Sequence, residues 1–352
     1  MNEMKNRTAA VKTQAKSRGV QKLRFYAQLG SLLLNIWIGI QFYLWVGHIE
    51  SGGQGLAIPR PAGVEGWLPI GSLVSVKHFF STGVINDIHP AGLIIFIMIV
   101  LTVFVFRKAF CSWICPIGFI SEMLGDISDK LFGKRIIPPK WLDWPLRSLK
   151  YLLLFFFVWA IVIQMTPAAI EAFLYSDYNV VSDILMLHFF TQITMFSLVV
   201  IAFLLAMSLV IRGFWCRYLC PYGALLGIFG LFSITRIKRN EVNCINCMAC
   251  TRVCPAFIEP KKVKQIWSDE CTGCMACVDS CPVKNTLTIV GTSTKSFSTR
   301  QWAAAVLIVF WGALLGAKLI GPWDNAIARE QYIEMMPSIE KGQIGHPGAD
   351  GK

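Results

Sequence analysis

Charged residues are scarce in this sequence. Only 15% of its 352 residues are charged, 55% are hydrophobic, and the mean hydropathy is +0.54. Because an ordinary soluble domain has about 25% charged residues, this composition excludes a soluble globular protein and indicates several membrane spans. The net charge of +12 does not indicate nucleic-acid binding, because the basic residues flank apolar stretches, where they orient the chain and contact anionic lipid. We expect no nucleic-acid partner.

Histidine is also scarce, with five residues in the whole chain. A bis-histidine haem site needs histidines in the middle of membrane-spanning helices, and none of the five lies in the middle of an apolar stretch. The sequence therefore predicts no haem and excludes a cytochrome b core. The five are His48, His78, His89, His188 and His346.

The twelve cysteines lack the scattered pairing of a disulfide-rich protein and fall into four short runs. Two runs repeat the pattern C-x2-C-x2-C-x3-C-P, the ligand spacing of a protein with two [4Fe-4S] clusters. Structural zinc, the alternative, usually takes C-x2-C pairs instead. Thiolate ligands need a reducing compartment, so we expect this part of the chain to face the cytoplasm.

The ferredoxin pattern predicts a crossed ligand assignment. The first three cysteines of each run bind one cluster, and the fourth binds the other cluster. One cluster is expected on Cys244, Cys247, Cys250 and Cys281, and the other on Cys271, Cys274, Cys277 and Cys254.

The remaining two cysteine runs form an internal repeat. Residues four apart share one face of a helix, so each C-x3-C pair is predicted to present two sulfurs at the cytoplasmic membrane surface. Facing copies would bring four thiols together, as ligands of a further iron–sulfur cluster or of a soft metal such as Cu(I), or as thiol–disulfide pairs; plain packing at a helix end is the alternative. Arg107, Cys111, Cys115, Pro116 and Gly118 recur 105 residues later as Arg212, Cys216, Cys220, Pro221 and Gly223.

Five apolar stretches have the roughly 17 to 25 residues that a membrane span needs. They are residues 25–46, 90–106, 149–165, 194–211 and 303–321. The Lys and Arg residues alternate between many and few along the chain. Seven precede the first stretch, eight lie between the second and third (107–150), and twelve lie between the fourth and fifth. Only two lie between the first and second, and none between the third and fourth. By the positive-inside rule, the N-terminus and the ferredoxin motifs are cytoplasmic and the C-terminus lies outside a bacterial inner membrane.

Three further segments fall outside this scheme. Residues 222–234 are too short to span and are predicted to form an interfacial or re-entrant helix on the cytoplasmic side. Residues 64–82 are expected to form a partly buried outer loop. The tail from residue 323 to 352, with two prolines and several glycines, is expected to be a loosely ordered extension.

The order of these motifs resembles the NapH/YccM-like family of membrane 4Fe-4S ferredoxin-type electron-transport proteins, which is related to the membrane half of NosR. The resemblance covers residues 28–290 and rests on F-C-S-W-I-C-P-I-G at 110–118, W-C-R-Y-L-C-P-Y-G at 215–223 and the ferredoxin runs. It implies electron transfer between membrane quinol and a respiratory reductase or a maturation system. The fifth span and the tail after it depart from the NapH pattern.

We therefore expect an all-α polytopic membrane protein with a duplicated core and an inserted α+β bacterial-type 2[4Fe-4S] ferredoxin domain. The expected parts are a basic tail (1–24), the membrane core (25–235), the ferredoxin domain (236–295), a fifth transmembrane helix (296–322) and an outer tail (323–352).

The expected function is electron transfer between the quinone pool and a redox protein, such as a respiratory reductase or its electron-transfer subunit. The chain would then be a subunit of a quinol dehydrogenase. Quinol oxidation needs a proton acceptor, for which His89 and His188 are candidates; ordinary polar residues at the membrane interface are the alternative. A maturation factor that handles metal for a respiratory metalloenzyme and a redox-sensing membrane protein are the other function classes.

Overall fold

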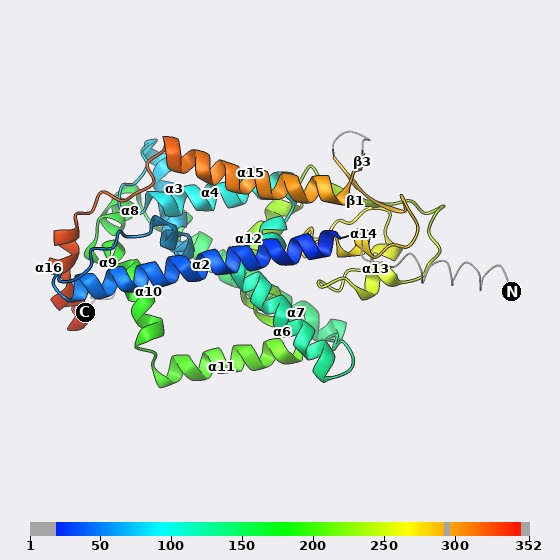
Figure 1. Cartoon of the computed structure of the whole chain (residues 1–352), viewed down its shortest axis with the longest axis horizontal. Helices are drawn as coiled ribbons and strands as arrows, with labels where there is room; N and C mark the ends of the chain where they lie inside the picture. Colours follow the sequence, from blue (N-terminus) through cyan, green and yellow to red (C-terminus); the bar gives the residue numbers. More distant parts are fainter. Residues whose placement is uncertain (1–18, 292–295, 346–352) are drawn as a thin grey trace. The chain divides into compact units, whose positions relative to one another are not determined.

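The chain, whose helices and strands are labelled in Figure 1, divides into two compact units. Each unit is built from three separate segments. In this computed structural model, residues 19–291 and 296–345 are described. The first unit comprises residues 1–32, 100–153 and 204–311 and carries all twelve cysteines; we call it the cysteine unit. The second comprises residues 33–99, 154–203 and 312–352 and carries all five histidines; we call it the histidine unit.

Long apolar helices indicate a multi-pass membrane protein. Three helices are long and apolar enough to cross a bilayer: α2 (Val20–Glu50), α7 (Lys140–Val158) continued by the π-helical turn η2 (Trp159–Gln164), and α15 (Thr299–Ile320). A fourth candidate joins α10 (Ser182–Thr191) to α11 (Met195–Val210) across a bend of 80°. The described residues thus contain three or four candidate spans.

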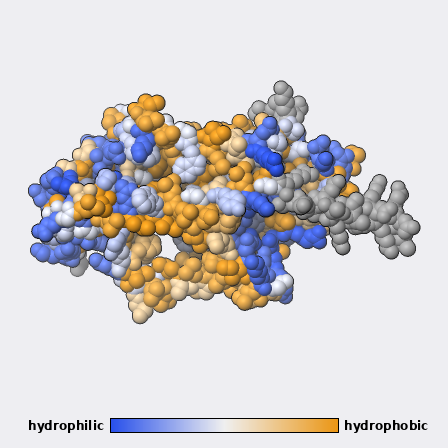
Figure 2. All heavy atoms as spheres, in the orientation of Figure 1, coloured by the Kyte–Doolittle hydropathy of each residue, from blue (hydrophilic) through white to orange (hydrophobic). Residues whose placement is uncertain are grey.

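The second apolar stretch expected from the sequence, residues 90–106, forms α4 (Pro90–Phe106), an apolar helix of 17 residues that is shorter than these candidates. Figure 2 shows hydrophobic side chains along α11, where Met195 and Phe196 are 75% and 78% exposed. Such exposure of large apolar side chains is costly in water and is ordinary against lipid.

Prolines start several of the shorter helices. Proline lacks the backbone N–H that a first turn leaves unpaired, and its fixed φ suits the first helical position. In the cysteine unit this applies to α6 and α12, while α5 and the π-helical turn η3 precede them. Their bounds are α5 Ala109–Trp113, α6 Pro116–Leu131, η3 Trp215–Leu219 and α12 Pro221–Gly230. Helix α12 lies where the sequence predicts a short interfacial or re-entrant helix.

The ferredoxin motifs lie between the strands of a small antiparallel sheet with strand order β1-β2-β3. Ile237 pairs with Ile289 in its register, and both side chains are buried. The segment between β1 and β2 contains two four-residue helices and a 3-10 turn, joined by loops. The elements are β1 Arg236–Arg239, α13 Ala249–Arg252, η4 Pro260–Lys262, α14 Ala276–Asp279, β2 Leu287–Val290 and β3 Ser296–Phe297.

The structure corrects two expectations in the histidine unit. Residues 64–82 are helical instead of forming a loop, with η1 (Ala62–Trp67) followed by α3 (Pro69–Thr82), because Pro69 starts a helix that Gly83 ends in the left-handed conformation at φ 73°.

The tail is the second correction. Within it, α16 (Arg329–Glu340) buries Tyr332, Met336 and Ile339, which share one helix face. The Tyr332 ring packs edge-on against Trp45 of α2, with centroids 5.0 Å apart. Residues 329–340 are therefore not a loose extension; residues 346–352 lie outside the described part of the chain.

The helices α3, α8 (Pro167–Leu174) and α9 (Asp177–Val180) complete this unit. Its main core joins residues of α2, α10 and α16, including Phe42, Val46, Ile184 and Tyr332.

Candidate iron–sulfur sites

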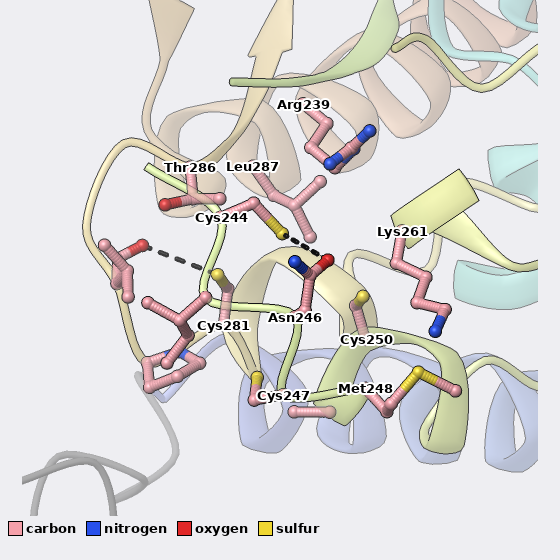
Figure 3. A pocket seen from close by; sticks show the side chains of 14 residues that line it. Arg239, Cys244, Asn246, Cys247, Met248, Cys250, Lys261, Cys281, Thr286 and Leu287 are labelled. Atoms are coloured by element: carbon pink, nitrogen blue, oxygen red, sulfur yellow. Dashed lines mark hydrogen bonds between the residues drawn. The ribbon is translucent and has the colours of Figure 1, made fainter. Parts of the chain in front are cut away.

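The pocket in Figure 3 is lined by the cysteines that the crossed assignment gives to the first cluster. Cys244 and Cys247 come from the loop after β1, Cys250 from α13, and Cys281 from the loop after α14. All four are partly exposed. Arg239 and Lys261 also line the pocket, so positive charge lies beside thiolates that would carry an anionic cluster.

The second crossed set is more enclosed. Cys254, Cys271 and Cys277 are only 9%, 8% and 7% exposed, and Cys274 is partly exposed. Cys254 interacts electrostatically with Cys274 and Cys271. Cys277 interacts with Cys254, Cys271 and Cys274. Burial and these neighbouring thiols raise the pKa of Cys254 to about 12, so ligation here must displace a thiol proton.

The two ferredoxin runs adopt the same local backbone. Asn246 and Gly273 occupy equivalent positions two residues after Cys244 and Cys271, and both have a positive φ, 55° and 60°. Met248 and Met275 are also equivalent and precede α13 and α14 with φ of 64° and 59°. These left-handed residues, uncommon outside glycine, make a tight turn between successive cysteines in each run.

The C-x3-C-P cysteines do not share one helix face, which corrects the sequence expectation. Cys111 lies within α5, but Cys115 is the N-cap of α6 with an extended backbone. Likewise Cys216 lies in η3 and Cys220 is the N-cap of α12. The cause is the following proline, which disfavours helical geometry in the residue before it.

The two copies of this motif nevertheless lie beside each other. Cys111 interacts electrostatically with Cys220, and Cys115 interacts with Cys111, Cys216 and Cys220. The rings of Phe110 in one copy and Tyr222 in the other lie edge to face, with centroids 6.4 Å apart.

Burial raises the pKa of Cys111 to about 11, although Lys108 opposes this effect. Burial together with the Cys220 thiol raises the pKa of Cys216 to about 12. The C-x3-C-P thiols are therefore protonated at neutral pH unless a metal displaces their protons.

The first copy also clamps the loop that carries the second ferredoxin run. Arg107 donates hydrogen bonds to the carbonyls of Ile266 (3.0 Å) and Ser268 (2.8 Å). Ser112 donates to Thr272 O at 2.7 Å, and the Trp113 indole donates to Gly273 O at 3.1 Å. Residues beside Cys111 are thus joined directly to residues beside Cys271.

Sequence analysis missed a network of buried charges beside these thiols. Lys108 is 4% exposed and Lys150 is fully buried. Lys150 forms an ion pair with Glu270, and Arg147 lies 3.2 Å from both Asp269 and Glu270. Two signals were available, namely that Lys108 follows the repeated arginine and that Asp269 and Glu270 directly precede Cys271.

Asp269 illustrates the strength of this network. Burial alone would raise its pKa, but a hydrogen bond from Tyr151 and the Arg147 and Lys150 cations outweigh burial and hold the pKa of Asp269 at about 2. The carboxylate is therefore ionised throughout the physiological range.

The histidine candidates lie in two different sets of contacts. His89 is buried, with Nε2 2.7 Å from Asn179 O and Nδ1 3.4 Å from Glu65 Oε1. The pKa of His89 is lowered by burial, but Glu65 more than offsets this and raises it overall. His188 instead contacts Glu50, with Nε2 to Oε1 at 3.0 Å.

Sequence analysis also missed the ion network around His89. Arg60 binds both Glu65 (2.8 Å) and Asp183 (2.6 Å), and both carboxylates are fully buried. Glu65 additionally accepts a hydrogen bond from the backbone N–H of Gly92 at 3.0 Å.

Within residues 19–291 and 296–345, no three His, Cys, Asp or Glu side chains lie close enough to hold a single metal ion. A four-iron cluster makes a different demand, because each cysteine binds a different iron of a body larger than one ion. The crossed ferredoxin sets and the four C-x3-C-P thiols meet the chemical demand for soft sulfur ligands.

Comparison with known proteins agrees with these cysteine groups. The model of a family described as "4Fe-4S binding domain" matches residues 88–135 and again 193–240, at the same offset of 105 residues as the C-x3-C-P motifs. A family described as "4Fe-4S dicluster domain" matches residues 236–282. No solved structure matches the chain.

Three curated relatives illustrate the similarity. "Putative electron transport protein YccM" of Escherichia coli (strain K12) is 41% identical over 94% of this chain and 93% of its own length. "Uncharacterized protein MJ0749" of Methanocaldococcus jannaschii is 27% identical over 59% of this chain and 76% of its own length. "Regulatory protein NosR" of Pseudomonas aeruginosa is 30% identical over 35% of this chain and 16% of its own length.

The cysteine groups, the two family models and the apolar helices define a membrane iron–sulfur protein. Within that class, the chain belongs to the family of YccM-like electron transport proteins with 4Fe-4S binding domains, and it is distantly related to NosR and NirI.

Proposed function

We propose that this protein passes electrons between the membrane quinol pool and a redox protein through two [4Fe-4S] clusters held by the crossed cysteine sets. The observation that carries the proposal is the grouping of the ferredoxin cysteines into one partly exposed set and one enclosed set within the same unit. When bound, such clusters each accept and release one electron.

The partly exposed set is the expected contact point for the redox partner. Lys262 and Lys264 near it are 62% and 83% exposed, and Arg239 and Lys261 line its pocket. Glu241 and Glu259 neutralise part of this charge, which leaves the surface positive. A positive surface attracts an acidic partner and speeds its encounter, as expected for a respiratory reductase or its electron-transfer subunit.

The enclosed set is suited to relay electrons inside the protein. Arg135 donates to the carbonyls of Arg252 (2.9 Å) and Cys254 (3.0 Å), and Gln21 of α2 donates to Cys274 O at 3.0 Å. Arg217, paired with Asp143, donates to Ala256 O at 3.0 Å. These contacts fix the cysteine loops against the helices of the cysteine unit, which supports a constant transfer geometry.

Quinol oxidation also requires proton release, and the histidine unit contains the candidate groups. His89 lies against Glu65, with Arg60 and Asp183 in the same network. The arrangement supports His89 as the proton acceptor, and the His188–Glu50 pair is a second candidate. Both remain predictions.

The proposed topology places five spans, α2, α4, α7 with η2, α11 and α15, in a bacterial inner membrane. The duplicated core and the distribution of Lys and Arg support cytoplasmic placement of the N-terminus and the ferredoxin domain, and an outer C-terminus.

The test uses the full-length protein, purified and reconstituted in liposomes without oxygen. Menaquinol or ubiquinol is added, and cluster reduction is followed by electron paramagnetic resonance. The proposal expects that at least one quinol reduces the clusters and that the clusters stay oxidised when quinol is omitted. Fully loaded clusters that neither accept electrons from any quinol nor donate electrons to any quinone would refute the quinol link.

A second function, metal handling for maturation of a respiratory metalloenzyme, is favoured by the four C-x3-C-P thiols. It expects that deletion of the protein abolishes the cofactor of a metalloenzyme while quinol oxidation by other enzymes in the same membranes continues.

A further inference from the structure

Each copy of the C-x3-C-P motif has only two cysteines, which are too few to hold a cubane alone. Each of the two matches to the 4Fe-4S binding domain contains only one C-x3-C pair, whereas a [4Fe-4S] cluster takes four cysteines. The structure joins the two copies, because the rings of Phe110 in the first copy and Tyr222 in the second lie edge to face with centroids 6.4 Å apart. Ser121 of α6 also hydrogen-bonds Cys216 across the repeat.

We propose that Cys111, Cys115, Cys216 and Cys220 hold one shared [4Fe-4S] cluster, that Lys108 is its built-in counter-cation, and that it exchanges electrons with the cluster on Cys271. This inference rests on the proposed electron-transfer function and adds a third redox site to it.

The charge beside the thiols is what an anionic cluster requires. Four thiolates around a cubane give a negative overall charge, which is costly to bury without a nearby cation. Lys108 is buried and interacts electrostatically with Cys111 and Cys220, and Lys150 also acts on Cys111. The second copy has Gly213 at the position of Lys108, so this cation is a departure from the repeat.

The same residues provide a short connection to the ferredoxin loop. Lys108 interacts with Glu270, which is the residue before Cys271. Ser112, the residue after Cys111, donates to Thr272 O, the residue after Cys271. An electron leaving a cluster on the C-x3-C-P cysteines would therefore reach a cluster on Cys271 through covalent bonds and one hydrogen bond of 2.7 Å. The C-x3-C-P cluster would lose one electron and the Cys271 cluster would gain it.

Iron content tests the site directly. The full-length protein, purified without oxygen, is expected to contain about twelve irons and twelve acid-labile sulfides per chain, from three cubanes of four irons each. Cys216→Ser and Cys111→Ser should each reduce both counts to about eight and keep the ferredoxin resonance signals.

About eight irons in the fully loaded wild-type protein would overturn the inference. So would copper in place of the additional iron, or a Cys111–Cys220 disulfide in the protein as purified. The quinol experiment is independent of these counts, so the two proposals can fail separately.

The reduction potential tests Lys108. Lys108→Met removes a positive charge, so reduction of the shared cluster becomes less favourable and its midpoint potential should shift to a more negative value. Lys108→Arg, which keeps the charge, should leave the midpoint potential close to that of the wild type. The exposed control Lys130→Met should cause no shift. A Lys108→Met protein with twelve irons and an unchanged potential would refute the role of Lys108. If Lys108→Met instead lost only the shared cluster and Lys108→Arg kept it, the result would support that role.

Discussion

The two units bury charge in opposite ways. In the histidine unit, two fully buried carboxylates, Glu65 and Asp183, share the guanidinium of Arg60, and Glu65 also lies against the imidazole of His89. In the cysteine unit, the buried cations Lys108 and Lys150 lie beside thiols as well as beside Glu270. In the histidine unit, the excess negative charge is balanced when the His89 imidazole gains a proton. In the cysteine unit, the lysine charges lie where thiolates and a cluster would add negative charge.

Breaking the histidine-unit network should give the largest change. Glu65→Gln leaves Arg60 with one carboxylate fewer and His89 without its acid partner. Removal of one member of a buried ionic network costs about 3–5 kcal/mol, so thermal unfolding in detergent should occur at a clearly lower temperature.

The exposed carboxylate Glu171 provides the matched control, because Glu171→Gln should be nearly neutral. Iron content in the folded Glu65→Gln protein should equal that of the wild type, since this network is remote in sequence from all twelve cysteines. Equal stability of the two variants would contradict the structural role of Glu65.

The repeat in the cysteine unit is expected to be asymmetric at its glycines. A Cβ at Gly118 would lie 2.1 Å from Cys111 O, whereas one at Gly223 would lie 3.5 Å from Cys216 O. Gly118→Ala must therefore displace backbone next to a cysteine, at a cost of about 1–3 kcal/mol. Gly223→Ala should be neutral or slightly stabilising, because alanine is the better helix former. Thermal unfolding of the two variants measures the difference, and equal losses would show that the copies are equivalent.

The sequence predicted well those features that depend on local spacing. The bounds of α4 coincide with residues 90–106, and the two ferredoxin runs lie in the segment that the dicluster family model matches. It failed where the decisive contact is distant. Arg60 and Asp183 are 123 residues apart, and no local sequence pattern predicts their ion pair.

The other failures also have physical causes. A helix of mixed polarity such as α16 is recognised only once Tyr332 is seen packed on Trp45. The single-helix expectation for the C-x3-C-P pairs neglected the effect of each proline on the preceding cysteine.

The pH dependence of stability should differ between wild type and a His89 variant. The folded-state pKa of His89 is raised above its unfolded value, so its protonated form contributes stability that is fully present below about pH 6.5 and is lost as the pH rises through the folded-state value. Burial lowers the pKa of the neighbouring Arg60, but Asp183 and Glu65 more than offset this and raise it overall, so Arg60 stays charged over this range. Unfolding temperatures of wild type should therefore fall between pH 6 and pH 9 more than those of His89→Gln; parallel curves would show that His89 does not titrate in the folded protein.

The smallest expected effect concerns the positive surface beside the partly exposed ferredoxin set. Lys262 and Lys264 are exposed, and removal of one exposed charge changes an encounter rate more than it changes stability. Oxidation of the reduced protein by ferricyanide, an anion, should slow about twofold in Lys264→Ala at low salt, and the difference should vanish at about 1 M salt, where the screening length is about 3 Å. Lys341→Ala, whose charge lies in the histidine unit, is the matched control. If both variants slowed equally, the effect would come from net charge alone and the ferredoxin surface would have no special part in attracting an acidic partner.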